Sequence, residues 1–224
     1  LRRIAGACVA DTGGLFVSLT GDDEAYFEEK LAALESVGIP AETLTPEEAR
    51  RIVPELTADV ERAVRVPDGV VYPSRLIAAN ALDARAHGAS IRPHAPVESI
   101  TVQDGEVTGV RLGGAAETSL SPEFVVNAAG AWAGKVAAMA GLTVEMQPTR
   151  GVMVSVEYDD LGPVLNRCRT PDDGDIVVPH DSEAVLGTTS VPVSDPDDYE
   201  TERWEAERTI EECAAMLPRL SDSP

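Results

Sequence analysis

The sequence predicts an α+β fold in which a mixed β-sheet carries helices on one face. Short runs of alternating or branched apolar residues, typical of strands, recur along the whole chain. Between them, segments with helical periodicity begin after Asp, Thr or Ser and end at Gly or Pro, as helices do. The chain has 224 residues, of which 43% are hydrophobic. We therefore expect a globular protein with a full core rather than a disordered one.

The N-terminal part of the chain predicts one strand followed by two helices. Leu15–Leu19 is an apolar run typical of a strand. Asp22-Asp23 caps a helix that Gly38 ends. Thr45-Pro46-Glu47-Glu48 is a capping box with proline at the first helical position, so a second helix begins there and stops at Pro54. These two helices account for the helical layer over the sheet.

The rest of the chain continues this alternation of strands and helices. We expect a strand and turn over 64–73, further strands over 91–100, 150–156, 175–179 and 183–189, a loop over 192–198, and helices over 74–88, 132–141 and 201–218. Asp104-Gly105, which separates two runs of alternating apolar residues, predicts a β-hairpin. The sequence contains no internal repeat.

Residues 124–133 combine the features of a crevice for a flat cofactor. Phe124–Val126 is an apolar run that predicts a buried strand, and Asn-Ala-Ala-Gly then allows the backbone to approach a ligand before Trp132 opens a helix. The dinucleotide fingerprint G-x-G-x-x-G and a Walker-type loop are both absent from the sequence. From the residues alone, the turn is therefore either a cofactor contact or a plain strand-to-helix connection.

The net charge of the chain argues against nucleic-acid partners and indicates a high-salt environment. The sequence has 39 acidic against 18 basic residues, a net charge of −21, and only two lysines, Lys30 and Lys135. Such a surface repels phosphate backbones, so we predict no nucleic-acid binding. Abundant acid with almost no lysine is typical of a protein from a high-salt cytoplasm, and we expect a haloarchaeal source. The absence of a long apolar run or a signal peptide predicts a cytoplasmic location.

Cysteines and histidines give no sign of a metal site or a disulfide framework. Neither type shows metal-ligand spacing, and the three cysteines lie far apart in the sequence: Cys8, Cys168 and Cys213; His87, His94 and His180. We therefore predict no metal in this chain.

Four runs of residues, in this order and spacing, resemble a known family. Residues 66–76, 125–132 and 187–189 are similar to the FAD-dependent glycerol-3-phosphate dehydrogenases of the D-amino-acid-oxidase-like superfamily. Residues 165–179 resemble the catalytic A-type chain of the anaerobic, quinone-linked enzymes most of all. The resemblance extends over nearly all of the chain.

This resemblance implies a middle piece of a larger flavoenzyme. Residues 1–64 and 142–224 would form the substrate, or cap, domain, and residues 65–141 would be an inserted, incomplete piece of the Rossmann-like FAD domain. The phosphate-binding glycines would lie upstream of Leu1. We therefore expect FAD in the full-length enzyme and none bound to this fragment alone.

The resemblance also implies an activity. The whole enzyme would oxidise sn-glycerol 3-phosphate to dihydroxyacetone phosphate and pass electrons to a quinone, through partner subunits that hold it at the inner face of the cell membrane. Two alternatives stay open. One is an amine or amino-acid oxidase of the same superfamily, and the other is a non-catalytic acidic interaction domain.

The residues expected at the site follow from the same resemblance. Residues matching the family's flavin contacts are Val97, Ala128, Ala129, Gly130 and Trp132, although core packing explains Val97 and Trp132 equally well. Arg150 and Thr189 are expected to bind the substrate. For Arg150 the alternatives are stabilisation of the reduced flavin and a surface salt bridge, and for Thr189 the alternative is a β-bend with a satisfied hydroxyl.

Two further positions bear on the chemistry. Met153 stands where aerobic relatives carry a histidine, so we assign no catalytic base in this chain. Arg167 and Arg169 could recruit an anionic substrate, dock a partner subunit, or neutralise the neighbouring acidic residues of their loop, and neutralisation is the interpretation we favour.

Overall fold

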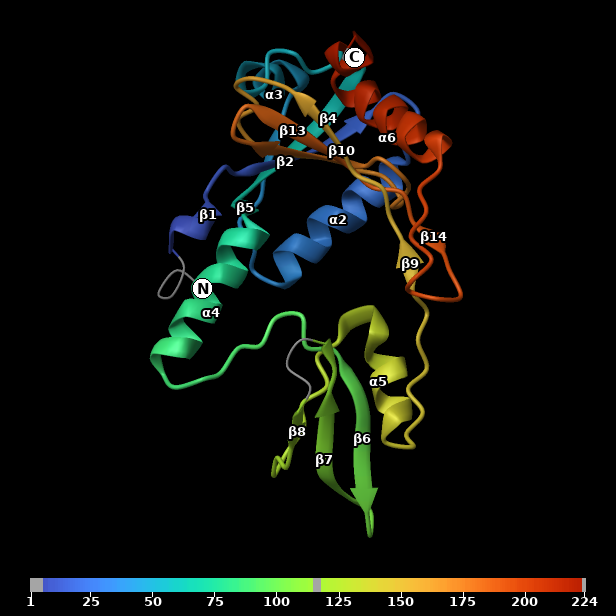
Figure 1. Cartoon of the computed structure of the whole chain (residues 1–224). Coiled ribbons are helices and arrows are strands. Elements are labelled where there is room, and N and C mark those ends of the chain that lie inside the picture. The colour runs from blue at the N-terminus through green and yellow to red at the C-terminus, as the bar shows by residue number, and fades with distance from the viewer. Residues whose placement is uncertain (1–5, 115–117, 223–224) are drawn as a thin grey trace. The chain divides into compact units, whose positions relative to one another are not determined.

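The structure of the protein is a computed structural model that describes residues 6–114 and 118–222. The chain forms two compact units (Figure 1). The first comprises the described residues within 1–80, 151–191 and 200–224, and the second those within 81–150 and 192–199. The functional division at 64/65 and 141/142 stays a prediction, and its outermost residues, 1–5 and 223–224, lie outside the described residues.

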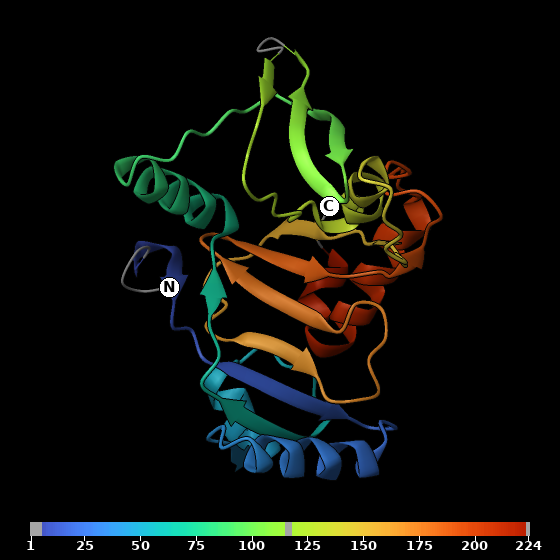
Figure 2. The same ribbon diagram turned by 90° about the horizontal axis from the view of Figure 1, so that it is seen from below.

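A seven-stranded mixed sheet is the centre of the first unit, and Figure 2 shows its strands side by side. In spatial order the strands are β10 (Val154–Glu157), β13 (Glu183–Gly187), β12 (Ile176–His180), β11 (Val164–Arg167), β2 (Gly14–Leu19), β4 (Val60–Val66) and β3 (Glu42–Leu44). β11 and β2 run parallel, whereas the other neighbours are antiparallel. The expected mixed sheet is confirmed.

The helices begin close to the residues that predict them. α2 (Glu24–Ser36) follows its N-cap Asp23, and α3 (Pro46–Ile52) carries the predicted capping box between Thr45 and Glu48. α6 (Arg203–Met216) is the C-terminal helix of the prediction. α4 (Pro73–Ala86) starts at Pro73, one residue before the expected cap Ser74, because proline suits the first helical position.

Helices cover both faces of the seven-stranded sheet, and this corrects the expectation of helices on one face. Leu15 and Val17 of β2 belong to the core cluster that includes α3 and α6, whereas Phe16 and Val64 pack with Phe27 of α2. In Figure 1, α3 and α6 lie above the sheet and α2 below it. Successive side chains of a strand point to opposite faces, so an uninterrupted apolar run needs cover on both sides.

The second unit contains a three-stranded antiparallel sheet and a short helix. The strands are β6 (Val97–Gln103), β7 (Glu106–Leu112) and β8 (Thr118–Leu120), and β6 begins later than the expected strand over 91–100. Asp104 and Gly105 form the predicted hairpin, with φ angles of 51° and 83°. A 3-10 turn, η3 (Gly130–Trp132), leads into α5 (Ala133–Met139), which ends before Gly141 as predicted.

Phe124–Val126 do not form the buried strand that their apolar pattern predicts. These residues belong to no strand, and the side chains of Phe124 and Val126 are 87% and 88% exposed. A strand needs a neighbour to pair its backbone groups, and no strand among the described residues pairs with this segment. The prediction was wrong for this chain because the pattern specifies a buried strand but supplies no partner.

The described residues also contain two small sheets and two further 3-10 turns. β1 (Val9–Ala10) pairs with β5 (Val70–Val71), and β9 (Thr149–Arg150) pairs with β14 (Val191–Pro192). The 3-10 turns are η1 (Gly6–Cys8) and η4 (Pro218–Asp222). The strand expected over 150–156 is thus divided between β9 and β10.

Candidate functional site

The turn at residues 127–132 is held in one conformation by Asn127. The Oδ1 atom of Asn127 accepts a hydrogen bond from the backbone N–H of Ala129 at 3.3 Å, and Nδ2 donates to the carbonyl of Ala133 at 2.9 Å. The N–H of Trp132 donates to the carbonyl of Ala129 at 3.0 Å. Gly130 has a φ of 56°, in the left-handed region that glycine adopts with least strain. The sequence Asn-Ala-Ala-Gly therefore specifies this turn locally.

The surface of the turn fits a flat cofactor such as FAD. Ala128 and Gly130 are exposed, Ala129 is half-buried, and a Cβ atom built on Gly130 would meet nothing within 4 Å. Side chains this small leave the peptide groups accessible to a ligand. The indole of Trp132, which is 44% exposed, adds an aromatic surface beside them.

Val97 lies in the same unit as the turn. It is half-buried at the start of β6, where it pairs with Leu112 of β7. α5, which the turn opens, contacts β6. All five residues expected to bind the cofactor therefore belong to one unit, although their cofactor role itself stays a prediction.

Lys135 of α5 joins the turn to a loop that is distant in the sequence. Its Nζ atom lies 2.7 Å from Oδ1 of Asp195 and 2.5 Å from Oδ2 of Asp197. Nε1 of Trp132 donates to Oδ1 of Asp197 at 2.8 Å. Hydrogen bonds to Asp195 and Asp197 raise the pKa of Lys135, and the same bonds lower the pKa of both carboxyl groups. We call these four residues the lysine clasp.

The lysine clasp was not predicted from the sequence. The residues indicated only a loop from Pro192 onward, and Lys135 stood out only as one of two lysines. In a chain with so few lysines, the rarity of the residue was the signal that could have drawn attention to this position.

The two residues expected to bind the substrate belong to different units. Arg150 is half-buried in β9, at the end of one segment of the second unit. Thr189 is 1% exposed in the first unit, where its hydroxyl accepts a hydrogen bond from the N–H of Val152 at 3.0 Å and donates to Oε1 of Glu205 at 3.1 Å. Thr189 therefore has a structural task, and the substrate roles of both residues stay predictions.

Met153 does not supply a catalytic base. Its side chain is 67% exposed, and a thioether accepts protons only weakly. The base therefore stays unassigned, as the sequence implied.

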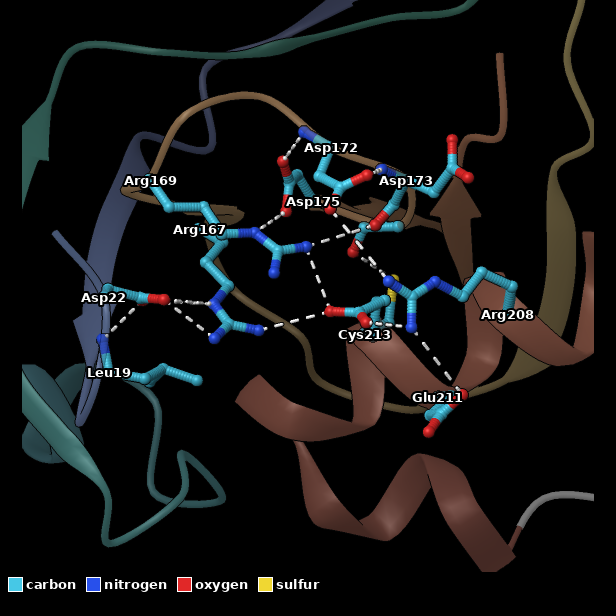
Figure 3. Close-up of polar contacts among 12 residues, drawn as sticks. Leu19, Asp22, Arg167, Arg169, Asp172, Asp173, Asp175, Arg208, Glu211 and Cys213 are labelled. Atoms are coloured by element: carbon cyan, nitrogen blue, oxygen red, sulfur yellow. Dashed lines mark hydrogen bonds and ion pairs between the residues drawn. The ribbon is translucent and has the colours of Figure 1, made fainter. Parts of the chain in front are cut away.

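Arg167 and Arg169 lie in a network of ion pairs (Figure 3). Arg167 contacts Asp22 at 2.8 Å and Glu212 at 3.3 Å, and Arg169 contacts Asp175 at 2.8 Å and Glu212 at 3.0 Å. These side chains are at most 19% exposed. The neutralisation that we favoured from the sequence is confirmed, but two of the acidic partners come from distant elements.

The three described cysteines are buried, and two of them, Cys168 and Cys213, are not nucleophiles. Burial raises the pKa of Cys168 to about 11 and that of Cys213 to about 12. The thiolate is the reactive form of cysteine, so neither group is poised for reaction at neutral pH. Among the described residues, no group of three or more His, Cys, Asp or Glu side chains is arranged to hold a metal ion.

A separate pocket of about 270 Å³ lies in the first unit, between the end of α3, the turn after β10 and η4. Tyr158 donates a hydrogen bond to Glu55, and Arg219 donates to the same carboxylate at 3.0 Å while its guanidinium lies 5.0 Å from the centre of the Tyr158 ring. Burial raises the pKa of Tyr158, and the hydrogen bond to Glu55 raises it further. These contacts bind three segments of the chain together.

In the part of the chain that the structure describes, no helix has the length and apolar composition to cross a membrane.

Comparison with known proteins gives consistent results. The family described as DAO, FAD dependent oxidoreductase, matches residues 2–223. The chain is 45% identical, over its full length, to the A1 subunit of the anaerobic glycerol-3-phosphate dehydrogenase of Haloferax volcanii, and it covers 40% of that protein. It is 39% identical, over 99% of its length, to the corresponding A-type chain of the Escherichia coli K12 enzyme, of which it covers 42%.

The fold is similar to that of a solved structure. Glycine oxidase from Geobacillus kaustophilus superimposes with a TM-score of 0.81 at 23% identity, over 99% of this chain and 59% of that one. At this identity the likeness concerns the fold alone. Because the family match extends over nearly every residue, the chain belongs to the DAO family of FAD-dependent oxidoreductases.

Proposed function

We propose that the chain is part of the catalytic A-type chain of an anaerobic glycerol-3-phosphate dehydrogenase. The observation that carries this proposal is the 45% identity to the Haloferax volcanii relative over the whole chain. The chain spans only about two fifths of the Haloferax and Escherichia relatives, 40% and 42% of their lengths, so the activity belongs to a longer protein. That protein oxidises the secondary alcohol of sn-glycerol 3-phosphate to the ketone of dihydroxyacetone phosphate.

FAD, when bound, supplies the hydride acceptor. Ala128, Ala129 and Gly130 offer their backbone to it, Trp132 an aromatic surface, and Val97 a backbone contact from β6. The open surface of the turn supports this assignment. Residues 65–141 are accordingly proposed as a piece of the FAD domain, and residues 1–64 and 142–224 as the substrate domain.

Arg150 and Thr189 are proposed to hold the substrate. A guanidinium binds phosphate oxygens with two parallel hydrogen bonds, which suits Arg150 to the phosphate of glycerol 3-phosphate. Thr189 is proposed to contribute by fixing its loop in the first unit, through its bonds to Val152 and Glu205. These residues orient the substrate and do not remove its hydroxyl proton.

Electron transfer to a quinone is proposed to proceed through partner subunits at the inner face of the membrane. The two relatives are themselves named as single subunits of their enzymes, which supports the existence of partners. The second candidate, an amine or amino-acid oxidase, is supported by 30% identity to the glycine oxidase of Bacillus licheniformis, over 98% of this chain and 57% of that protein.

The deciding experiment uses the full-length flavoprotein. Under anaerobic conditions, sn-glycerol 3-phosphate should bleach the visible flavin band, whereas glycine and sarcosine should not. Bleaching by the amines alone would support the oxidase instead, and a protein without flavin would support a non-catalytic acidic domain.

Arg150→Met tests the substrate site in the same protein. Loss of a charge-assisted hydrogen bond should raise KM for glycerol 3-phosphate about 10- to 100-fold. Arg150→Lys should recover part of the loss. Arg111→Met is the matched control, because Arg111 forms an exposed pair with Glu98 in the same unit. An unchanged KM in Arg150→Met would remove Arg150 from the substrate site.

A further inference from the structure

The loop at residues 192–199 belongs to the second unit, although the chain on either side of it belongs to the first. Several contacts hold this loop in the second unit. Val193 N donates to the carbonyl of Pro148 at 3.0 Å, and the lysine clasp joins Asp195 and Asp197 to α5. These contacts tie the loop to Pro148 and to the start of α5.

Within the clasp, Asp197 has two partners that lie three positions apart in the chain. Its Oδ1 atom accepts from the indole of Trp132 and its Oδ2 atom from Lys135. Asp195 orients Asp197 further, because its Oδ1 atom accepts from the N–H of Asp197 at 2.9 Å. A carboxylate that accepts hydrogen bonds at both oxygens is restricted in its orientation, and so is the indole that donates to it.

Trp132 is also the last residue of the turn that Asn127 stabilises from the other side. The backbone of the turn is thus fixed by Asn127, and its aromatic side chain is fixed through Asp197 by Lys135. The side chain of Lys135 is 44% exposed, and its Nζ atom donates to both carboxylates of the clasp.

We propose that Lys135 is a positioning residue for FAD binding, which acts through Asp197 to hold the indole of Trp132 in the orientation that contacts the cofactor. This inference rests on the proposed function, because it takes the 128–132 turn as a cofactor contact. Lys135 itself touches neither cofactor nor substrate.

The clasp can be tested without any cofactor, on the 224-residue chain. The indole N–H signal of Trp132 in a ¹⁵N-correlated NMR spectrum reports the bond to Asp197, and Trp204→Phe identifies it because the chain has two tryptophans. Asp197→Ala should move this signal toward its position in the unfolded chain. Lys135→Met should move it in the same direction, Asp195→Ala should move it less, and Lys135→Arg should restore it.

The positioning role is tested in the full-length flavoprotein. Lys135→Met should weaken FAD binding about two- to fivefold, the range expected for an exposed ion pair, and alter the shape of the visible flavin band. Lys135→Arg should restore both. Lys30→Met is the matched control, since it removes the other lysine, which lies over the Phe16 ring in the first unit, and should leave both unchanged.

The outcomes separate the two proposals. A full-length protein that binds no FAD overturns the proposed function and the positioning role together, while the indole signal still reports whether the clasp exists. If FAD binds but Lys135→Met matches Lys30→Met, the proposed function stands and the positioning role is overturned. An unmoved indole signal in Lys135→Met also overturns it.

Discussion

Arg167 and Asp22, which are 145 residues apart in the sequence, join β11 to the start of α2. Nη2 of Arg167 lies 2.8 Å from Oδ1 of Asp22, and Nε lies 3.1 Å from Oδ2. Asp22 also accepts the N–H of Leu19, the last residue of β2, at 2.8 Å, so its carboxylate is held from two strands, β11 and β2. The two side chains are 13% and 4% exposed, which places this pair in the interior of the first unit.

Removing Arg167 should therefore be costly. Arg167→Met leaves the buried carboxylate of Asp22 without its cation, and we expect a loss of about 3–5 kcal/mol in the free energy of unfolding. Urea denaturation measures this loss. Arg65→Met, which breaks the exposed pair with Glu42, should cost less than about 1 kcal/mol. Similar losses in the two variants would show that the buried pair contributes no more to the free energy of unfolding than the exposed pair does.

Thr189 provides a test of a buried hydroxyl. Thr189→Val keeps the shape but removes the donor to Glu205 and the acceptor for Val152 N, and we expect a loss of about 1–3 kcal/mol in thermal or urea unfolding. Thr189→Ser keeps both hydrogen bonds and should cost clearly less. A larger loss in Thr189→Ser than in Thr189→Val would mean that the methyl group, rather than the hydroxyl, stabilises this loop.

The stability of the first unit should depend on Glu55 at acid pH. The hydrogen bond from Tyr158, with a further contribution from Arg219, lowers the pKa of Glu55 in the folded state. A carboxyl group with a lowered pKa contributes stability above its unfolded pKa of about 4.3, and this contribution is lost as the pH falls through the folded value. The stability difference between the wild type and Glu55→Gln should therefore shrink below about pH 4.

Urea midpoints between neutral and acid pH measure that difference. Glu47→Gln is the control, because the side chain of Glu47 is 73% exposed and lies 3.8 Å from Arg50 in a surface pair. Its difference from the wild type should stay small across the whole range. A constant difference for Glu55→Gln would contradict the assignment of this pair.

Salt should stabilise the chain as a whole. With a net charge of −21, the folded state repels itself at low ionic strength, and molar salt reduces the screening length to about 3 Å. The midpoint of thermal unfolding should rise between low and molar KCl. A midpoint that does not rise would remove the composition-based argument for a high-salt environment.

The sequence by itself determined the local elements and the family. The capping box at Thr45 and Glu48, the hairpin at Asp104-Gly105 and the turn at Asn127 all form as predicted, because their decisive hydrogen bonds and backbone angles involve residues within a few positions of one another. The family motifs were likewise readable as short runs of residues in order. The roles of Arg150, Thr189 and the proposed flavin contacts stay predictions.

Only the tertiary structure decided which distant groups meet. Asp22 pairs with Arg167, and Lys135 pairs with Asp195 and Asp197. The partners are so far apart in the sequence that no local pattern predicts these pairs. Tertiary packing also decided that helices cover both faces of the seven-stranded sheet. It likewise decided that no described strand pairs with residues 124–126. A periodic pattern of apolar residues predicts that one face of an element is buried. Which residues bury it depends on how the whole chain packs.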